Sequence, residues 1–293
     1  MAWEPPPDFL PAAPPKEACM RRIDWESAGE TMKLYKDFMA FTIDNAFTES
    51  ECQELIKAAE ASTITPDSPT PTWKRAMINA GRGKEVMVPD SRNCGRILYN
   101  APDVAEKIMD RLRPFFIEAG VDTIYDQGQI TGLGPLKRNE TMQMTRLNEL
   151  LRFLKYEGGE YFREHCDGSY VTPDEKERSL FTVHLYLNGD GEQDLNELAE
   201  AEKRAKEEEE EEEEEEMFTN IDHSGKLLGG ATSFHPFIMG SDDGDDGGLR
   251  VFPKTGSVLL FQQRNLCHAG DDVYRGVKYT IRTEIMYRKV DQS

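Results

Sequence analysis

The second half of the chain is a series of short strands, and this pattern limits the possible fold more than any other feature. Apolar and polar residues alternate in short stretches that are divided by turns, without helices between them. Such spacing predicts a sandwich or barrel rather than alternating strands and helices. The predicted strands are Leu150–Tyr156, Ser179–Leu187, Ala231–Phe237, Leu249–Phe252, Ser257–Phe261 and Lys278–Tyr287, with a turn at Gly240–Gly248.

Two helices are predicted ahead of these strands. The first follows a strand at Phe41–Ile43 and begins at a capping box, in which Thr48 and Glu51 each satisfy a backbone N–H at the helix start. The second begins near Pro102 and is expected to end at the helix-breaking Pro114. Each helix has an apolar stripe at helical spacing, which predicts that both pack against the sheet.

The same patterns divide the chain into regions. Residues 1–37 form a proline-rich extension without periodicity, 38–145 a helical support region, and 146–293 a mainly β domain. An acidic insertion at about 190–227 contains the unbroken run Glu207–Glu216, in which neighbouring charges repel. We expect a mobile or partly helical segment. Its role stays open between steering a basic polypeptide towards a site and serving as a solvated spacer.

Composition excludes several classes of protein. The net charge is -20, and removing the ten glutamates of the run still leaves about -10, so a basic nucleic-acid footprint is absent. The five cysteines are scattered without a C-x-x-C pair, which indicates neither a disulfide framework nor a zinc cluster. The N-terminus lacks a signal peptide and no apolar run approaches membrane-spanning length. We therefore expect a cytoplasmic or nuclear protein that binds neither nucleic acid nor membrane.

Two residues on one extended segment suggest half of a metal site. His165 and Asp167 are two positions apart, so they project to the same face of a strand while Cys166 points away. A lone His-x-Asp pair is more often a turn or a solvated hydrogen bond. With one further nitrogen it becomes the 2-His-1-carboxylate triad of non-haem Fe(II) oxygenases. His268, which follows a buried apolar strand and a turn, is the candidate third ligand.

A cationic strand follows ten residues after this histidine. Alternation places Lys278, Thr280 and Arg282 on one face. Two cations inside a small barrel are costly to bury without an anion. A solvated face is the simpler explanation for an isolated strand. Beside a His-x-Asp and a second histidine, a dicarboxylate co-substrate explains the pair better.

These motifs together resemble the Fe(II)/2-oxoglutarate dioxygenases, in particular the prolyl 4-hydroxylase-like catalytic domain. The resemblance rests on the order of His165, Asp167, His268 and Lys278, together with the motif Gly229–Phe234, and covers roughly residues 145–290. It implies a double-stranded β-helix, or jelly roll, with flanking helices. The long acidic insertion and the extra cation Arg282 depart from the family pattern, and they leave the substrate and the anion clamp open.

The resemblance also implies roles for individual residues. It implies iron ligation by His165, Asp167 and His268, with Lys278 on the distal carboxylate of 2-oxoglutarate and Arg282 able to take over that role. The remaining candidates are Tyr156 and Tyr186 for co-substrate binding, and Arg152 and His184 near the substrate. For Arg152, an acidic neighbour is an equal alternative. His184 is expected to line the pocket without binding metal, and Cys166 and Cys267 to serve packing.

The activity implied is hydroxylation of an amino-acid side chain in a protein, with release of succinate and carbon dioxide. Fe(II), 2-oxoglutarate and dioxygen are the implied cofactor and co-substrates, with ascorbate as a candidate reductant. A hydroxylase of a free amino acid or small metabolite is the first alternative. A catalytically silent jelly roll that serves as a binding module is the second, weakened because every ligand position is filled. The sequence leaves the oligomeric state open.

Overall fold

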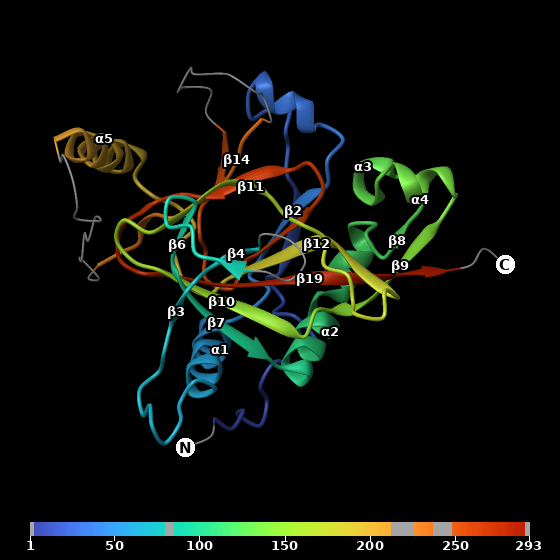
Figure 1. The fold of residues 1–293 in the computed structure, drawn as a ribbon, viewed down its shortest axis with the longest axis horizontal. Helices are drawn as coiled ribbons and strands as arrows, with labels where there is room; N and C mark the ends of the chain where they lie inside the picture. Colours follow the sequence, from blue (N-terminus) through green and yellow to red (C-terminus); the bar gives the residue numbers. More distant parts are fainter. Residues whose placement is uncertain (1–2, 80–84, 212–224, 237–247, 291–293) are drawn as a thin grey trace.

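The computed structural model describes residues 3–79, 85–211, 225–236 and 248–290. In this part of the chain, two antiparallel sheets lie against each other, and helices flank the larger one (Figure 1). The predicted mainly β fold with a jelly-roll core is confirmed.

The larger sheet has ten strands in the described residues. In spatial order its main path is β1 (Cys19–Arg22), β2 (Ala40–Asp44), β16 (Val258–Gln262), β12 (Glu177–Tyr186), β19 (Lys278–Val290), β10 (Leu150–Tyr156), β7 (Gly95–Asn100) and β3 (Lys74–Arg75). Off this path, β9 (Thr141–Leu147) pairs with β19, and β8 (Thr123–Ile124) pairs with β9.

The smaller sheet completes the jelly roll. Its order is β15 (Leu249–Val251), β14 (Thr232–Phe234), β17 (Cys267–Gly270), β11 (Tyr161–Cys166) and β6 (Arg92–Asn93). Along the chain, β10, β12, β16 and β19 belong to the larger sheet, whereas the intervening β11, β14 and β17 belong to the smaller one. This alternation between sheets is the winding of a double-stranded β-helix. Two short pairs stand apart: β13 (Leu228–Gly229) with β18 (Val273–Arg275), and β4 (Ile78–Asn79) with β5 (Glu85–Val86).

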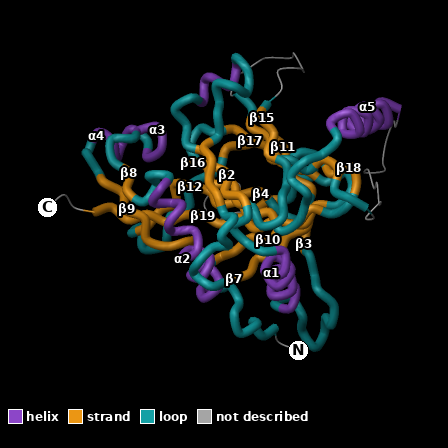
Figure 2. The backbone as a smooth tube through the Cα atoms, turned by 180° about the vertical axis from the view of Figure 1, so that it is seen from behind, coloured by secondary structure: helices purple, strands orange, loops and turns teal. Residues whose placement is uncertain are grey.

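The two faces of the larger sheet differ in chemistry. Its outer face is apolar and forms one buried cluster with α1 (Glu49–Ala61) and α2 (Pro102–Glu118), which lie on the same side of the molecule (Figure 2). Residues of this face include Leu151, Phe153, Val183, Leu185, Ile281 and Ile285. Alternation sends the other residues of the same strands inwards, and these include Arg152, Tyr156, His184, Tyr186, Lys278 and Arg282. The candidate site residues therefore share the inner face.

The helix predictions are right about the starts and wrong about one end. α1 has the predicted capping box between Thr48 and Glu51. α2 begins at Pro102 but continues through Pro114 to Glu118. Phe116, two residues after Pro114, is fully buried. The apolar packing of the last helical turn therefore outweighs the loss of the backbone hydrogen bond that Pro114 cannot donate.

The N-terminal segment is more ordered than its composition indicated. Cys19–Arg22 is strand β1 and pairs with β2 at the edge of the larger sheet. Trp25 and Tyr35 are buried, and Trp25 donates a hydrogen bond to the carbonyl of Phe38. Tyr35 belongs to a short 3-10 helix, η1 (Thr31–Tyr35). The aromatic residues of this segment do not recur at helical or strand spacing, so the sequence pattern did not predict its structure.

The six predicted strands are present, with small shifts of their bounds, and Phe237, the last residue predicted for one of them, lies outside the described residues. Several strands were not predicted, among them β9 and β17; before His268 the sequence indicated a turn instead of β17. The acidic insertion forms α5 (Leu195–Glu211) in its described part, while residues 212–216 of the glutamate run lie outside the described residues. The predicted turn at Gly240–Gly248 also lies outside them, apart from its last residue.

The remaining helices are short. They are α3 (Gly128–Thr131) and α4 (Leu133–Lys137), which follow β8. Among the described residues, no helix combines the length and apolar character needed to cross a bilayer.

The ion pair between Arg111 and Glu51 should be a main stabilising contact between the two helices. Arg111 is 1% exposed, and both of its terminal nitrogens lie 2.8 Å from a carboxylate oxygen of Glu51. Arg111→Ala leaves this half-buried carboxylate without its cation, so we expect the free energy of unfolding to fall by about 3 kcal/mol. Urea denaturation measures the loss. Lys57→Ala, which removes an exposed pair with Glu54, should leave stability nearly unchanged, and equal losses would contradict the assignment.

Candidate active site

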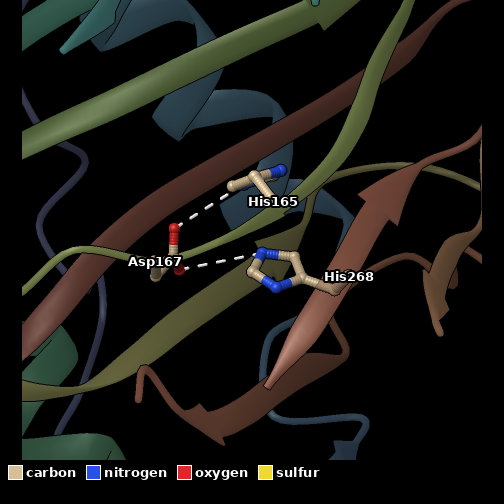
Figure 3. A group of neighbouring side chains, drawn as sticks. All are labelled: His165, Asp167 and His268. Carbon is tan, nitrogen blue, oxygen red and sulfur yellow. Dashed lines mark ion pairs between the residues drawn. The ribbon is translucent and has the colours of Figure 1, made fainter. Parts of the chain in front are cut away.

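Three potential metal ligands converge between the sheets. His165 on β11 and His268 on β17 are direct partners in an antiparallel pair, and Asp167 follows β11 immediately. His165 Nε2 lies 3.7 Å from Asp167 Oδ1, and His268 Nε2 lies 3.8 Å from Asp167 Oδ2 (Figure 3). One ligand atom from each residue falls within 4.8 Å of the other two. The predicted triad is thus brought together by strand pairing.

The histidine rings are held with one nitrogen free. His165 Nδ1 lies 2.9 Å from the carbonyl oxygen of Arg163, and His268 Nδ1 lies 3.1 Å from that of Leu266. A carbonyl only accepts hydrogen bonds, so each Nδ1 carries the proton and donates. Each Nε2 therefore presents a lone pair towards Asp167. This is the arrangement in which a backbone carbonyl orients a metal-binding imidazole.

The ionisation states of the three side chains also suit a cation. Burial, and then the neighbouring His268, lower the pKa of His165 to about 3. Burial likewise lowers the pKa of His268. For Asp167, burial alone would raise the pKa, but Arg282 and the two imidazoles together bring it well below its usual range. Two neutral imidazoles and one carboxylate result near neutral pH, which is the donor set of a divalent transition metal.

Asp167 is fixed by two further side chains. Thr182 Oγ1 donates to Asp167 Oδ2 at 2.5 Å, and Arg282 Nη2 lies 2.7 Å from Oδ1. Arg282 also approaches Glu284 at 3.6 Å. Glu284 in turn accepts from Arg152 at 2.9 Å. Of the two alternatives for Arg152, the acidic neighbour is thus present, and Arg282 is engaged with carboxylates of the chain itself.

Lys278 differs from Arg282 because its charge is buried without a carboxylate partner. Its side chain is 1% exposed, and the described residues contain no carboxylate within ion-pair distance of its ammonium. Nζ lies 4.9 Å from the ring centre of Tyr156 and 5.9 Å from that of Tyr186. Burial lowers the pKa of Lys278 to about 8, against the opposing charge of Asp271. Burying a charge without a partner is costly, so we expect an anionic ligand to pair with this ammonium.

Buried polar atoms without partners lie around the same space. Among the described residues, His184 Nε2, Thr280 Oγ1 and Arg92 Nε are buried and make no hydrogen bond. Thr280 lies between Lys278 and Arg282 on the inner face of β19, and His184 is opposite Arg282 on β12. Natural interiors rarely leave such groups unpaired. A ligand with several oxygens, placed between the triad and Lys278, would satisfy them.

Arg92, which was not predicted from the sequence, lies beside the triad. It lies on the two-residue strand β6, opposite Phe162 of β11. Its guanidinium is 4.4 Å from the ring centre of Phe162, whose ring stacks on that of His165 at 3.6 Å. Arg92 also lowers the pKa of Tyr156, although burial of that phenol prevails and raises it. A two-residue strand has no measurable period, so only the strand pairing reveals this residue.

The two cysteines beside the ligands are also direct partners. Cys166 and Cys267 form the next pair of the β11–β17 ladder after His165 and His268. Cys166 is exposed and Cys267 is buried. The packing role predicted for both therefore does not suit Cys166.

Comparison with known proteins adds likenesses of fold. No protein-family model matches the sequence, and no curated protein matches it. The viral collagen prolyl hydroxylase of Paramecium Bursaria Chlorella virus-1, solved with 2OG, is similar with a TM-score of 0.45 and 17% identity over 85% of this chain and 96% of that one. A prolyl hydroxylase from Trichoplax adhaerens, solved with a hypoxia inducible factor peptide, has a TM-score of 0.41 and 13% identity, over 80% of this chain and 74% of that one. A non-heme alpha ketoglutarate dependent epimerase of nogalamycin biosynthesis has a TM-score of 0.40 and 13% identity, over 87% of this chain and 80% of that one.

We expect alanine at His165, Asp167 or His268 to abolish binding of a divalent metal, because each removes one of three ligands. Asp167→Glu should fail as well, since its longer arm misplaces the oxygen beyond the tolerance of a metal site of about 0.2 Å. Titration with Mn²⁺, followed by calorimetry, measures this. His235→Ala, which changes a histidine outside the triad, is the control. Tight binding by either histidine variant would contradict the assignment.

Proposed function

We propose that this chain is an Fe(II)- and 2-oxoglutarate-dependent dioxygenase that hydroxylates an amino-acid side chain in a protein. The observation that carries the proposal is the convergence of His165, Asp167 and His268 on the same inner space as the unpaired ammonium of Lys278. A metal triad and a buried cation are the two anchors that an iron-bound dicarboxylate needs. The three unpaired polar atoms nearby support a ligand with several oxygens.

Iron held by the triad would supply dioxygen activation and the oxidative decarboxylation of 2-oxoglutarate to succinate and carbon dioxide, coupled to C–H hydroxylation. The residues of the protein bind and orient the metal and the co-substrate. The two Nε2 atoms and one oxygen of Asp167 would hold the metal, as in the 2-His-1-carboxylate sites of oxygenases. Arg282 and Thr182 hold the carboxylate in place. Burial of Asp167, His268 and Lys278 limits the access of water to these groups.

Within this proposal, Lys278 holds the distal carboxylate of 2-oxoglutarate. The rings of Tyr156 and Tyr186 lie beside the Lys278 ammonium. Arg282 is the weaker candidate, because Asp167 and Glu284 already neutralise its charge. Tyr186 donates its hydroxyl hydrogen to Thr232 at 2.7 Å, so it contributes its ring to this pocket. We propose that His184 and Arg92 meet the remaining ligand oxygens, since His184 Nε2 and Arg92 Nε are buried without a partner.

A polypeptide substrate is supported by the exposed edge of the site. His165 retains 22% exposure of its side chain, and the segment that follows Asp167 runs along the surface. Tyr170 and Val171 on this segment are exposed, at 39% and 38%. Exposed apolar side chains beside a catalytic site are suited to contact with a second chain. We propose a cytoplasmic or nuclear location because the scattered cysteines indicate no disulfide framework, and ascorbate as the reductant on the family resemblance alone.

The experiment that tests the proposal is anaerobic reconstitution with Fe(II) and 2-oxoglutarate, followed by admission of oxygen. Peptides derived from a proteome and a pool of free amino acids are supplied in separate reactions. Mass spectrometry should find a +16 Da peptide together with stoichiometric succinate. Hydroxylation of only the free amino acids would favour a metabolite hydroxylase. Binding of peptides without succinate would favour a binding module.

Lys278→Ala should weaken binding of 2-oxoglutarate by about a hundredfold or more. The physical reason is that a desolvated ion pair that loses one partner costs about 3–5 kcal/mol. Calorimetry with the Mn²⁺-loaded protein gives the dissociation constant. Lys155→Ala is the matched control, because Lys155 lies on the adjacent strand and pairs with Glu157 instead. If Arg282→Ala weakens binding and Lys278→Ala does not, the two cations have the opposite roles.

Affinity for 2-oxoglutarate should also fall above pH 8. Burial lowers the pKa of Lys278 to about 8 in the free protein, so the lysine is charged below this pH and neutral above it. Because the carboxylate binds the charged form, affinity should be constant below pH 8 and decline by up to about tenfold per pH unit above it. Calorimetry between pH 7 and 9 measures the slope. Lys278→Arg keeps its charge, so a variant with the same decline would contradict this origin.

A further inference from the structure

We propose that Cys166 and Cys267 form a reversible disulfide across β11 and β17, and that this bond weakens the adjacent metal site. The two residues are direct partners in the antiparallel ladder, one position from the pair His165 and His268. Both cysteines are free thiols in the structure. The inference goes beyond the proposed activity, although its consequence for the metal rests on it.

The ladder geometry allows the bond. Direct partners in antiparallel strands have Cα atoms about 4.5–5.5 Å apart, which falls within the range of about 4.4–6.8 Å found for disulfides. Both side chains leave the same face of the ladder, opposite to the two histidines. The other three cysteines, Cys19, Cys52 and Cys94, lie on β1, on α1 and between β6 and β7, so neither strand of this ladder carries one.

The two thiols have the complementary exposure of an attacking and a resolving cysteine. Cys166 is exposed, whereas Cys267 is buried. With hydrogen peroxide as oxidant, the Cys166 thiolate attacks one peroxide oxygen and breaks the O–O bond, which gives a sulfenic acid and hydroxide. The hydroxide takes up the proton that the Cys166 thiol released and becomes water. Cys267 then attacks that sulfur, its proton leaves with the hydroxyl group as a second water, and the S–S bond forms. Two thiols lose two electrons in total, and one peroxide gains them.

The disulfide acts on the metal through the shared strands. A disulfide brings its Cβ atoms to about 3.8 Å, whereas direct partners across a ladder have Cβ atoms about 4.5–5.5 Å apart. Closing that gap on the cysteine face tilts the strands and moves the histidines on the other face. Metal–ligand distances tolerate only about 0.2 Å. We therefore expect the oxidised protein to bind metal about tenfold more weakly, in the range of changes next to a metal site.

The test oxidises metal-free protein with equimolar hydrogen peroxide, which avoids iron-catalysed side reactions. Trypsin then releases peptides 164–176 and 265–275, each with a single cysteine. The expected product is these two peptides joined, 2 Da lighter than their sum and separated by dithiothreitol. Calorimetry with Mn²⁺ before oxidation, after it and after reduction should show weaker binding that recovers. Cys166→Ser should form no joined peptide and keep its affinity through the treatment, and Cys19→Ser should behave as the unmodified protein.

Each other result has a defined meaning. Absence of the joined peptide, or only +16 and +32 Da products at Cys166, would overturn the disulfide. A joined peptide with unchanged Mn²⁺ affinity would overturn the coupling to the metal. Failure of the reduced protein to bind Mn²⁺ would instead contradict the proposed function and, if the joined peptide forms, leave the disulfide supported.

Discussion

The pairing of β11 with β17 is the constraint on which the candidate site depends. His165 and His268 are far apart in the sequence, and only their register brings their imidazoles side by side. A slip of either strand by one residue would send its histidine to the opposite face and bring its cysteine inwards. The metal site is therefore specified by backbone hydrogen bonds before any metal binds. The neighbouring carbonyls of Arg163 and Leu266 then fix the orientation of the rings.

The larger sheet separates stability from chemistry by its two faces. Its outer face is apolar and packs against α1 and α2. Its inner face gathers charges that a core would exclude, and most of them are balanced locally: Arg282 by Asp167, and Arg152 by Glu284. Lys278 is the exception, since burial lowers its pKa to about 8 and no carboxylate of the described chain pairs with it. An imbalance confined to one residue is better explained by a bound anion than by imperfect packing.

Periodicity predicted the parts of the fold that are regular, and failed where a segment is short. Alternation placed His165 with Asp167, and Lys278 with Arg282, on common faces, as the structure has them. The same alternation extended by one step to Glu284 would have indicated the carboxylate that pairs with Arg152 and Arg282. Pro114 was given too much weight because the sequence alone does not show that Phe116 is buried. Arg92 and β1 were missed because two to four residues carry no period, and only long-range pairing defines them.

The unpaired atoms of the inner face indicate where selection for function has overridden stability. A buried polar group without a partner costs about 1–3 kcal/mol, and His184 Nε2, Thr280 Oγ1 and Arg92 Nε are three such atoms. Thr280 and His184 lie on adjacent strands, beside the residues that hold Asp167 and beside Lys278. At these positions, apolar residues of similar size would give the ligand-free protein a higher stability. Their polarity is therefore explained by a ligand that spans from the triad to Lys278 and contributes oxygens along its length, which is the shape and chemistry of a short dicarboxylate.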